Sequence, residues 1–203
     1  MNFLDYTNTL LKVFDITKRC VYKKVFTSLN SVSLFLRGVE HGENLTFVGW
    51  TKIKKANGSM LQIGSNCFLF SHMSNLIRVN RPCILSAMNK DSRLEIGSGY
   101  GFSSTVIGYF SQIKLEKNVR CGTSKLIADS DWYLDDSRSS IPRSINIKYS
   151  VWLGVTVTAI KGVTRGENSV MGVESVVTND IPSNVIAAGN PYRIIWGINI
   201  WKL

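Results

Sequence analysis

Between Leu153 and Thr178 the hydrophobic positions recur every six residues. Read in sixes, this segment is LGVTVT, AIKGVT, RGENSV and MGVESV, followed by VT. The first position of the repeat holds Leu153, Ala159, Arg165, Met171 and Val177, and the fifth position holds only valine or serine. A period of six suits neither a helix nor a lone strand, but it suits short strands that turn a corner every six residues. We therefore predict a coil of short strands with the first position inside.

The same period appears upstream in separate islands. The pairs six residues apart are Ile63 and Leu69, Ile96 and Phe102, and Leu115 and Cys121. Phasing is lost around residues 75–90 and 108–115, where we expect irregular coils or loops. Arg165 takes an inward position, and a buried unpaired guanidinium is costly, so we expect it to reach outward or to meet an acid across an interface.

The first forty residues follow a helical period instead. One stripe at spacings of three, four or seven contains Leu4, Leu11, Phe14, Val21, Val25 and Leu29. We predict one or two amphipathic helices in the segment 1–40. Two interpretations of the stripe stay open. It packs on the strands or on a neighbouring subunit, which we favour, or it makes peripheral contact with a membrane, for which five nearby basic residues are a weak signal.

The C-terminal half of the chain resembles a known family. The run from Val151 to Ile195, which closes with IPSNVIAAGNPYRII, is similar to the hexapeptide-repeat acyltransferases, and most similar to O-acetyltransferases of bacterial surface-polysaccharide gene clusters. The resemblance implies an all-β fold, a left-handed parallel β-helix over residues 41–191 with a loop at 129–143, after the N-terminal α-helical segment 1–40 and before a helical or extended tail at 192–203. It also implies acetyl-CoA as co-substrate and a homotrimer with sites between subunits. Acyl transfer from a thioester itself requires no metal, because the acyl carbon is already activated.

The loop DSDWYLDDSRSSIPR interrupts the repeats with polar residues. In similar enzymes it reads like DSDWH, and the histidine takes a proton from the acceptor hydroxyl. Tyr133 stands at that position here, and a phenol with a pKa of about 10 is already protonated where an imidazole of about 6.5 accepts a proton. Asp131 and His72 are the other candidate bases, and we place Trp132 and Arg138 at the acceptor. A solvated loop whose carboxylates cap turns and pair with arginines is the alternative.

Acetyl-CoA contacts follow from the same resemblance. Trp152 and Gly154 match residues near the pantetheine end, Gly172, Thr178 and Asn179 match residues farther along the groove, and Arg193 matches a residue at the nucleotide phosphates. Asn179 replaces a lysine that is common there, which weakens the attraction for phosphate. For Gly154 and Gly172 the alternative role is close packing between coils, and a glycine can serve both roles at once.

The composition of the chain limits the kinds of partner and metal site that it can have. The formal net charge of +10 and the pI near 9.6 favour an anionic partner, but the basic residues are dispersed and carry no nucleic-acid-binding motif. Two histidines cannot supply a three-histidine zinc site, and the four cysteines form no CxxC pair. Met1 is followed by no signal-peptide pattern, and no apolar run approaches the roughly 18 residues of a spanning helix. We expect a cytoplasmic protein, with contact at the inner face of the cytoplasmic membrane left open.

The predicted function is acetyl-CoA-dependent O-acetylation of a sugar hydroxyl in a surface polysaccharide or its precursor. Three explanations of Tyr133 stay open: another residue is the base, the chain is a weakened or inactive homologue, or the loop alignment is shifted by a few positions. A non-catalytic trimeric binding or scaffold protein is therefore the alternative from another class. Acetylation of serine or of an amino sugar on nitrogen shares the fold and differs only in the acceptor.

Overall fold

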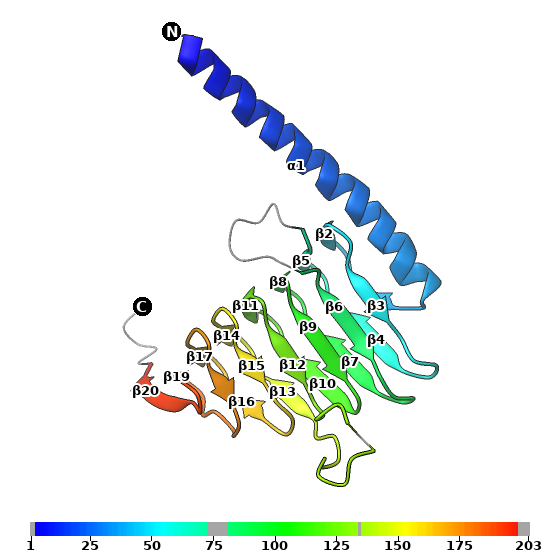
Figure 1. Ribbon diagram of the computed structural model, residues 1–203, viewed down its shortest axis with the longest axis vertical. Coiled ribbons are helices and arrows are strands. Elements are labelled where there is room, and N and C mark those ends of the chain that lie inside the picture. Colours follow the sequence, from blue (N-terminus) through cyan, green and yellow to red (C-terminus); the bar gives the residue numbers. More distant parts are fainter. Residues whose placement is uncertain (1–2, 73–80, 134, 199–203) are drawn as a thin grey trace.

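One long helix precedes a coil of short strands in the computed structural model, which describes residues 3–72, 81–133 and 135–198 (Figure 1). The helix α1 spans Phe3–Leu36. Sheet A contains β1 (Glu40–His41), β4 (Met60–Ile63), β7 (Arg93–Ile96), β10 (Gln112–Leu115), β13 (Ile145–Ile147) and β16 (Thr164–Arg165). Sheet B contains β2 (Thr46–Val48), β5 (Phe68–Phe70), β8 (Gly101–Ser103), β11 (Arg120–Thr123), β14 (Trp152–Leu153), β17 (Val170–Met171), β19 (Val185–Ala188) and β20 (Arg193–Gly197). Sheet C contains β3 (Lys52–Lys54), β6 (Ile84–Ala87), β9 (Val106–Tyr109), β12 (Leu126–Ala128), β15 (Thr158–Ala159) and β18 (Val176–Val177).

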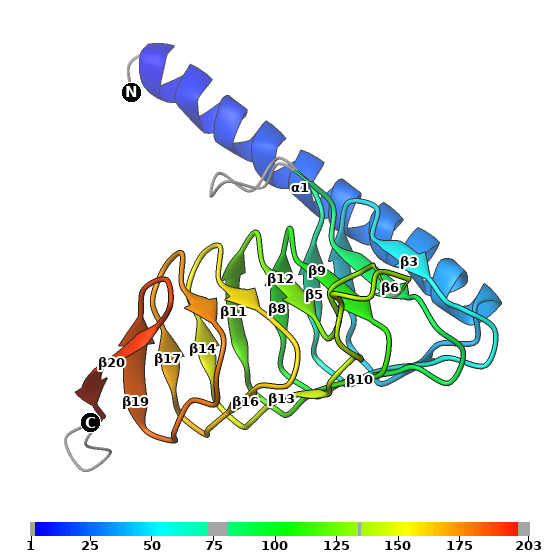
Figure 2. The same cartoon turned by 60° about the horizontal axis from the view of Figure 1, so that its bottom comes forward.

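Each turn of the coil passes from sheet A to sheet B to sheet C, and the next turn pairs parallel to it. For example, β7, β10 and β13 pair in parallel register, as do β8, β11 and β14 apart from one irregularity between β8 and β11. The coils therefore stack along one axis as a parallel β-helix with three edges, which we name A–B, B–C and C–A (Figure 2). At the C-terminal end, β20 turns back antiparallel to β19.

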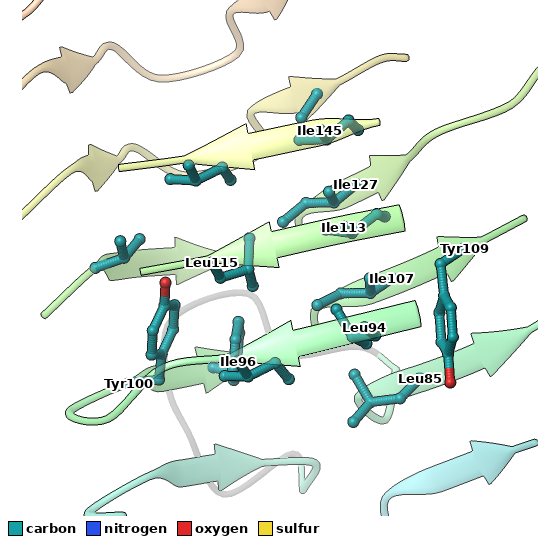
Figure 3. Close-up of a cluster of buried hydrophobic side chains, with 14 of the residues drawn as sticks. Leu85, Leu94, Ile96, Tyr100, Ile107, Tyr109, Ile113, Leu115, Ile127 and Ile145 are labelled. Carbon is teal, nitrogen blue, oxygen red and sulfur yellow. The ribbon is translucent and has the colours of Figure 1, made fainter. Parts of the chain in front are cut away.

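The core is the inside of the coil. Because side chains alternate along a strand, every second residue points inward, and the parallel register places these residues above one another in columns. Leu94, Ile113 and Ile145 form part of the sheet A column, and Ile107 and Ile127 part of the sheet C column (Figure 3). All five are essentially buried. The six-residue period is therefore the sequence signature of these columns.

Small polar residues and glycines turn the A–B edge. Asn66, Asn118 and Asn168 have φ angles of 57°, 59° and 55°, a left-handed conformation that asparagine tolerates better than most residues. At the same edge, a Cβ on Gly64 would lie 2.5 Å from the carbonyl carbon of Gly97 on the next coil. Glycine is required there because two backbones approach closely.

The C-terminal half of α1 packs on the first coil. Asn30 donates to the carbonyl of Gly49 at 3.1 Å and accepts from the amide of Thr51 at 3.1 Å. The hydroxyl of Thr27 accepts from the amide of Phe47 at 3.0 Å. The helix thus satisfies backbone groups of a coil that has no preceding coil to pair with. The predicted helical segment is one helix rather than two.

One detail differs from the sequence expectation. The interval 108–115 carries no loop, because only two residues separate β9 from β10, and the loss of phase reflects a short corner. In the interval 75–90 the structure has one strand, β6 (Ile84–Ala87), with irregular structure on either side at 81–83 and 88–90, while residues 75–80 lie outside the described part.

Arg165 does not reach outward as expected but is fully buried. It lies in register with Ile147 and Ile181 in an inward column, so the strand alternation directs its side chain into the coil. None of its three side-chain nitrogens has a hydrogen-bond partner within the described residues. Burial lowers the pKa of Arg165 to about 10, against an opposing effect of nearby Cys121.

Candidate active site

Loop 129–143 leaves the coil at the C–A edge, and Asp129 fixes its base. The two carboxylate oxygens of Asp129 accept the backbone N–H groups of Phe110 and Ser111 at 2.7 and 2.8 Å. The carbonyl of Asp129 accepts the amide of Arg143 at 2.9 Å and closes the loop. Burial raises the pKa of Asp129, and the bonds from Phe110 and Ser111 oppose that rise. The loop is therefore held to the previous coil by a buried carboxylate.

Trp132 lies over the outer face of sheet C. Its indole stands edge-on to Phe110 with ring centroids 5.4 Å apart, and a Cβ added to Gly108 would come within 2.6 Å of the indole. Trp132 has a φ of 73°, which is rare for an aromatic residue and concentrates at functional sites. Gly108 on β9 thus leaves room for the half-exposed indole of Trp132. The acceptor contact predicted for Trp132 stays a prediction.

Asp131 is engaged by a residue that the sequence did not single out. Lys161, on the next coil at the same edge, donates to the Asp131 carboxylate, and the amide of Ser140 donates to it at 3.3 Å. The hydrogen bond from Lys161 lowers the pKa of Asp131. A lower pKa makes a carboxylate a weaker proton acceptor, so this geometry suits anchoring better than general base catalysis. Nothing in the sequence indicated that Lys161 would contact Asp131, because this ion pair depends on the path of loop 129–143.

Tyr133 and Arg138 lie on the solvent-facing part of the loop. The Tyr133 side chain is 71% exposed. Arg138 donates to the carboxylate of Asp136 from its Nε at 2.9 Å and from its Nη2 at 2.5 Å. This pair raises the pKa of Arg138 and lowers that of Asp136. The loop therefore presents a phenol where the sequence resemblance places a base.

His72 lies at a different edge from the loop. It follows β5 in sheet B and precedes β6 in sheet C, so it belongs to the B–C edge near α1. Its ring packs against Tyr22 of α1 with centroids 4.9 Å apart. Within one chain, the structure does not bring His72 together with Tyr133 and Asp131.

The residues predicted to contact acetyl-CoA divide into two sets. Trp152, 51% exposed on β14, and the corner glycines Gly154 and Gly172 lie on sheet B and the B–C edge. A Cβ on Gly154 would lie 2.6 Å from the carbonyl oxygen of Met171, and one on Gly172 would lie 2.6 Å from the Cβ of Ala188. Coil packing alone therefore requires glycine at both positions.

The second set follows the C–A edge. Thr178 and Asn179 are exposed just after β18, on the edge that carries loop 129–143 and Lys161 on earlier coils. Arg193 begins β20 of sheet B, in register with Ala188, and Tyr192 before it donates its hydroxyl to the carbonyl of Asp180 at 2.6 Å. The structure thus places Arg193 on the sheet that carries Trp152, and only Thr178 and Asn179 of the predicted cofactor residues lie at the C–A edge.

A buried lysine supports the B–C edge and was missed from the sequence. Lys125 is fully buried and donates to the carbonyl of Gly154. Burial lowers the pKa of Lys125 to about 8. Cys121 on β11 is in register with Leu153 on β14, and Lys125 follows Cys121 by four residues just as the buried Val157 follows Leu153. Extending the six-residue repeat back to β11 would therefore have placed Lys125 inside the coil.

Replacing Lys125 by methionine should change how stability depends on pH. The folded pKa of about 8 lies below the ordinary value of 10.5, so between these values the unfolded chain binds more protons and the wild type gains stability as pH rises. We expect the wild type to gain up to roughly 3 kcal/mol relative to Lys125→Met between pH 7 and 10.5. Urea unfolding of both proteins across this range measures the gap. A gap that is independent of pH would contradict the burial of a titrating ammonium.

No metal site is evident in the part of the chain that the structure describes, where no group of three His, Cys, Asp or Glu side chains is arranged to hold an ion. No described helix is both long and apolar enough to cross a membrane.

Curated relatives match a short part of the chain. The galactoside O-acetyltransferase of Escherichia coli K12 is 54% identical over 55 residues, or 27% of each chain. The galactoside O-acetyltransferase of Lactococcus lactis is 46% identical over 57 residues, or 28% of each chain. The chain thus aligns with about a quarter of the length of these relatives. No family model matches it.

Solved structures match most of the chain. AntD, an N-acyltransferase from Bacillus cereus in complex with dTDP and 3-hydroxybutyryl-CoA, has a TM-score of 0.65 at 18% identity and covers 83% of this chain and 88% of its own. A hexapeptide-repeat-containing acetyltransferase from Vibrio cholerae has a TM-score of 0.54 at 18% identity, covering 86% and 81%. The fold is that of the hexapeptide-repeat acyltransferases.

The hexapeptide-repeat fold confirms the coil of short strands predicted from the period of six and the left-handed β-helix that the resemblance implies. The polySia-specific acetyltransferase NeuO has it too, with a TM-score of 0.50 at 22% identity over 78% of this chain and 74% of that one. At these identities the likeness to solved structures concerns the fold alone. The roles of individual residues rest on the geometry described above.

Proposed function

We propose that this chain is an acetyl-CoA-dependent acyltransferase that O-acetylates a sugar hydroxyl of a bacterial surface polysaccharide or its precursor. The observation that carries the proposal is the 54% identity over 55 residues to a galactoside O-acetyltransferase. This level of identity is far above that of the fold-level matches, and it belongs to a protein whose named activity is transfer of an acetyl group to a sugar.

The chemistry required is modest. A thioester already carries an activated acyl carbon, so the protein has to orient the acceptor hydroxyl, remove its proton and stabilise the oxyanion. In this proposal Trp132 supplies the surface on which the sugar ring lies, and Arg138 contacts its polar groups. Asp131, held by Lys161, positions the loop rather than taking the proton.

The two sets of cofactor candidates support a homotrimer. Trp152 with Gly154 and Gly172 lies on sheet B and the B–C edge, whereas Asn179 and loop 129–143 lie at the C–A edge. In this proposal the C–A edge of one copy faces sheet B of another, a single extended acetyl-CoA touches both sets there, and each site is shared by two subunits.

Tyr133 favours a second candidate function, a trimeric homologue that binds acetyl-CoA without efficient turnover. At neutral pH a phenol donates a proton but does not accept one. Within one chain, neither of the other two candidate bases is well placed to accept the hydroxyl proton. Asp131 is paired with Lys161, and His72 lies at another edge of the coil.

The two functions separate in a transfer assay. The purified protein is incubated with radiolabelled acetyl-CoA and a panel of neutral sugars, acidic polysaccharides, amino sugars and serine, and both free thiol and labelled acceptor are measured. Labelled ester on a sugar supports O-acetylation, whereas amide on an amino sugar or on serine redirects the proposal to N-acetylation. Hydrolysis or transfer no faster than in the buffer control, with binding retained, supports the non-catalytic candidate.

Arg193→Ala should weaken CoA binding under both candidate functions. A hydrogen bond to a charged group contributes about 1.5 to 3 kcal/mol, so the loss of one phosphate contact predicts a dissociation constant roughly 10- to 100-fold higher. Calorimetric titration with CoA measures it, and Arg93→Ala, an exposed arginine on β7 of sheet A, is the matched control. Equal CoA affinities for the wild type and Arg193→Ala would contradict the proposal that Arg193 contacts the nucleotide phosphates.

A further inference from the structure

The helix α1 carries an exposed apolar stripe. Val21, Val25, Leu29, Val32 and Leu36 recur at spacings of three and four along it, and each is between 48% and 74% exposed. Residues at these spacings share one face of a helix. This stripe continues the one found in the sequence, and the structure leaves it without a partner among the described residues of its own chain.

A different face of α1 packs on the β-helix. Asn30 and Leu34 are buried, Tyr22 and Phe26 stack on each other, and Tyr22 also packs against His72. At 3.6 residues per turn, this face lies about a third of a turn from the stripe. The helix is thus fixed by one face and presents another, while its N-terminal half extends past the coils (Figures 1 and 2).

Positive charge is concentrated at the same end of the molecule. Residues 17–60 contain eight lysines and arginines but only two acids, which accounts for six of the ten formal net charges. Lys23 and Lys24 are exposed on α1, and Lys52 and Lys54 point outward from β3 of the first coil. An amphipathic helix with an apolar face and basic residues binds in the plane of a membrane interface, more strongly where the lipids are anionic.

We propose that α1 docks on an anionic lipid surface through this stripe. At 3.6 residues per turn Lys24 lies beside the stripe, whereas Lys23 lies on the opposite side of the helix. The stripe enters the boundary between headgroups and acyl chains, and the ammonium group of Lys24 contacts lipid phosphates. The helix lies on the surface rather than across it, in agreement with the finding that no described helix can span a membrane. Docking concerns a surface remote from loop 129–143 and is independent of the proposed function.

Charge favours lipid over a second copy of the chain as the occupant. Between Lys18 and Lys24 four of seven residues are basic and none is acidic. Two such helices packed side by side in parallel along the stripe would bring these like charges together, which is unfavourable, whereas anionic headgroups neutralise them. The same stripe that would be a poor contact between copies is well suited to a phosphate-rich surface.

Vesicle flotation tests the proposal with the full chain. Vesicles of phosphatidylcholine with 30% phosphatidylglycerol, a composition chosen for the assay, should bind the wild type at least roughly tenfold more tightly than pure phosphatidylcholine. Val25→Ser with Leu29→Ser should reduce binding to the neutral-lipid level. Lys24→Glu, beside the stripe, should weaken binding roughly tenfold or more, and Lys23→Glu, on the opposite side of the helix, should weaken it less. Ile141→Ser, which replaces an exposed residue of loop 129–143, and Lys90→Glu with Lys117→Glu are the matched controls and should bind like the wild type.

Light scattering completes the test by giving the molar mass of each protein. The two serine substitutions should abolish flotation and leave both the molar mass and the helical circular dichroism unchanged. The proposal is overturned if the wild type does not float with anionic vesicles, or if the control substitutions weaken flotation as much as the stripe substitutions. A lower mass in the stripe variant, with no flotation of the wild type, would assign the stripe to contact between copies.

Discussion

Tyr133→His is expected to raise the rate of acetyl transfer by about 10²- to 10⁴-fold. The loop already presents residue 133 to solvent beside Trp132, so an imidazole there needs no new backbone path. Its unperturbed pKa of about 6.5 lets it accept the hydroxyl proton at neutral pH, which the phenol does not. Asp131 does not replace it well, because Lys161 lowers the pKa of that carboxylate.

Tyr133→Phe is the matched control for this gain. It removes the hydroxyl and keeps the ring, so it should transfer acetyl at the wild-type rate if the phenol takes no part in the chemistry. The histidine variant should also acquire a pH–rate profile that rises through about 6.5. If the wild type turns over as fast as Tyr133→His, another residue is the base, and Asp131→Asn and His72→Ala then show which.

Asp129→Ala is expected to lower the free energy of unfolding by about 2 to 5 kcal/mol. The substitution leaves the N–H groups of Phe110 and Ser111 without the acceptors that they have at 2.7 and 2.8 Å in the fully buried Asp129 carboxylate. It also frees the base of loop 129–143. The loss should therefore appear both in denaturant unfolding and in transfer activity of the Tyr133→His background.

Two comparisons make the Asp129 result specific. Asp135→Ala removes an exposed carboxylate from the same loop and should change stability by less than about 0.5 kcal/mol. Asp129→Asn keeps the shape but turns an amide donor toward one of the two N–H groups, so it should destabilise nearly as much as alanine. Equal stability of Asp129→Ala and the wild type would mean that the loop base is held by other contacts.

The periodic part of the fold was predictable because each coil repeats the same inward and outward pattern. Leu153, Met171 and Val177 were placed inside by the period of six and are buried. Arg165 was not, because the expectation followed the polarity of the side chain, whereas the strand register decides where it points. Lys125 was missed because the repeat was not followed across the irregular register of β11.

The site was less predictable than the coil. Sequence resemblance located loop 129–143, but the pairing of Asp131 with Lys161 depends on how the loop folds back over the next coil. Likewise, the room that Gly108 gives to the Trp132 indole joins a residue of β9 to a loop residue 24 positions later. Such contacts follow from the path of an irregular segment, for which a periodic pattern carries no information.

The binding of acetyl-CoA tests the account most directly, because both the catalytic and the non-catalytic candidate require it. Isothermal titration of the wild-type protein with CoA should give saturable binding with one site per chain and a dissociation constant that rises roughly 10- to 100-fold in Arg193→Ala. Absence of saturable binding by a folded wild-type protein would contradict the account, whatever its fold.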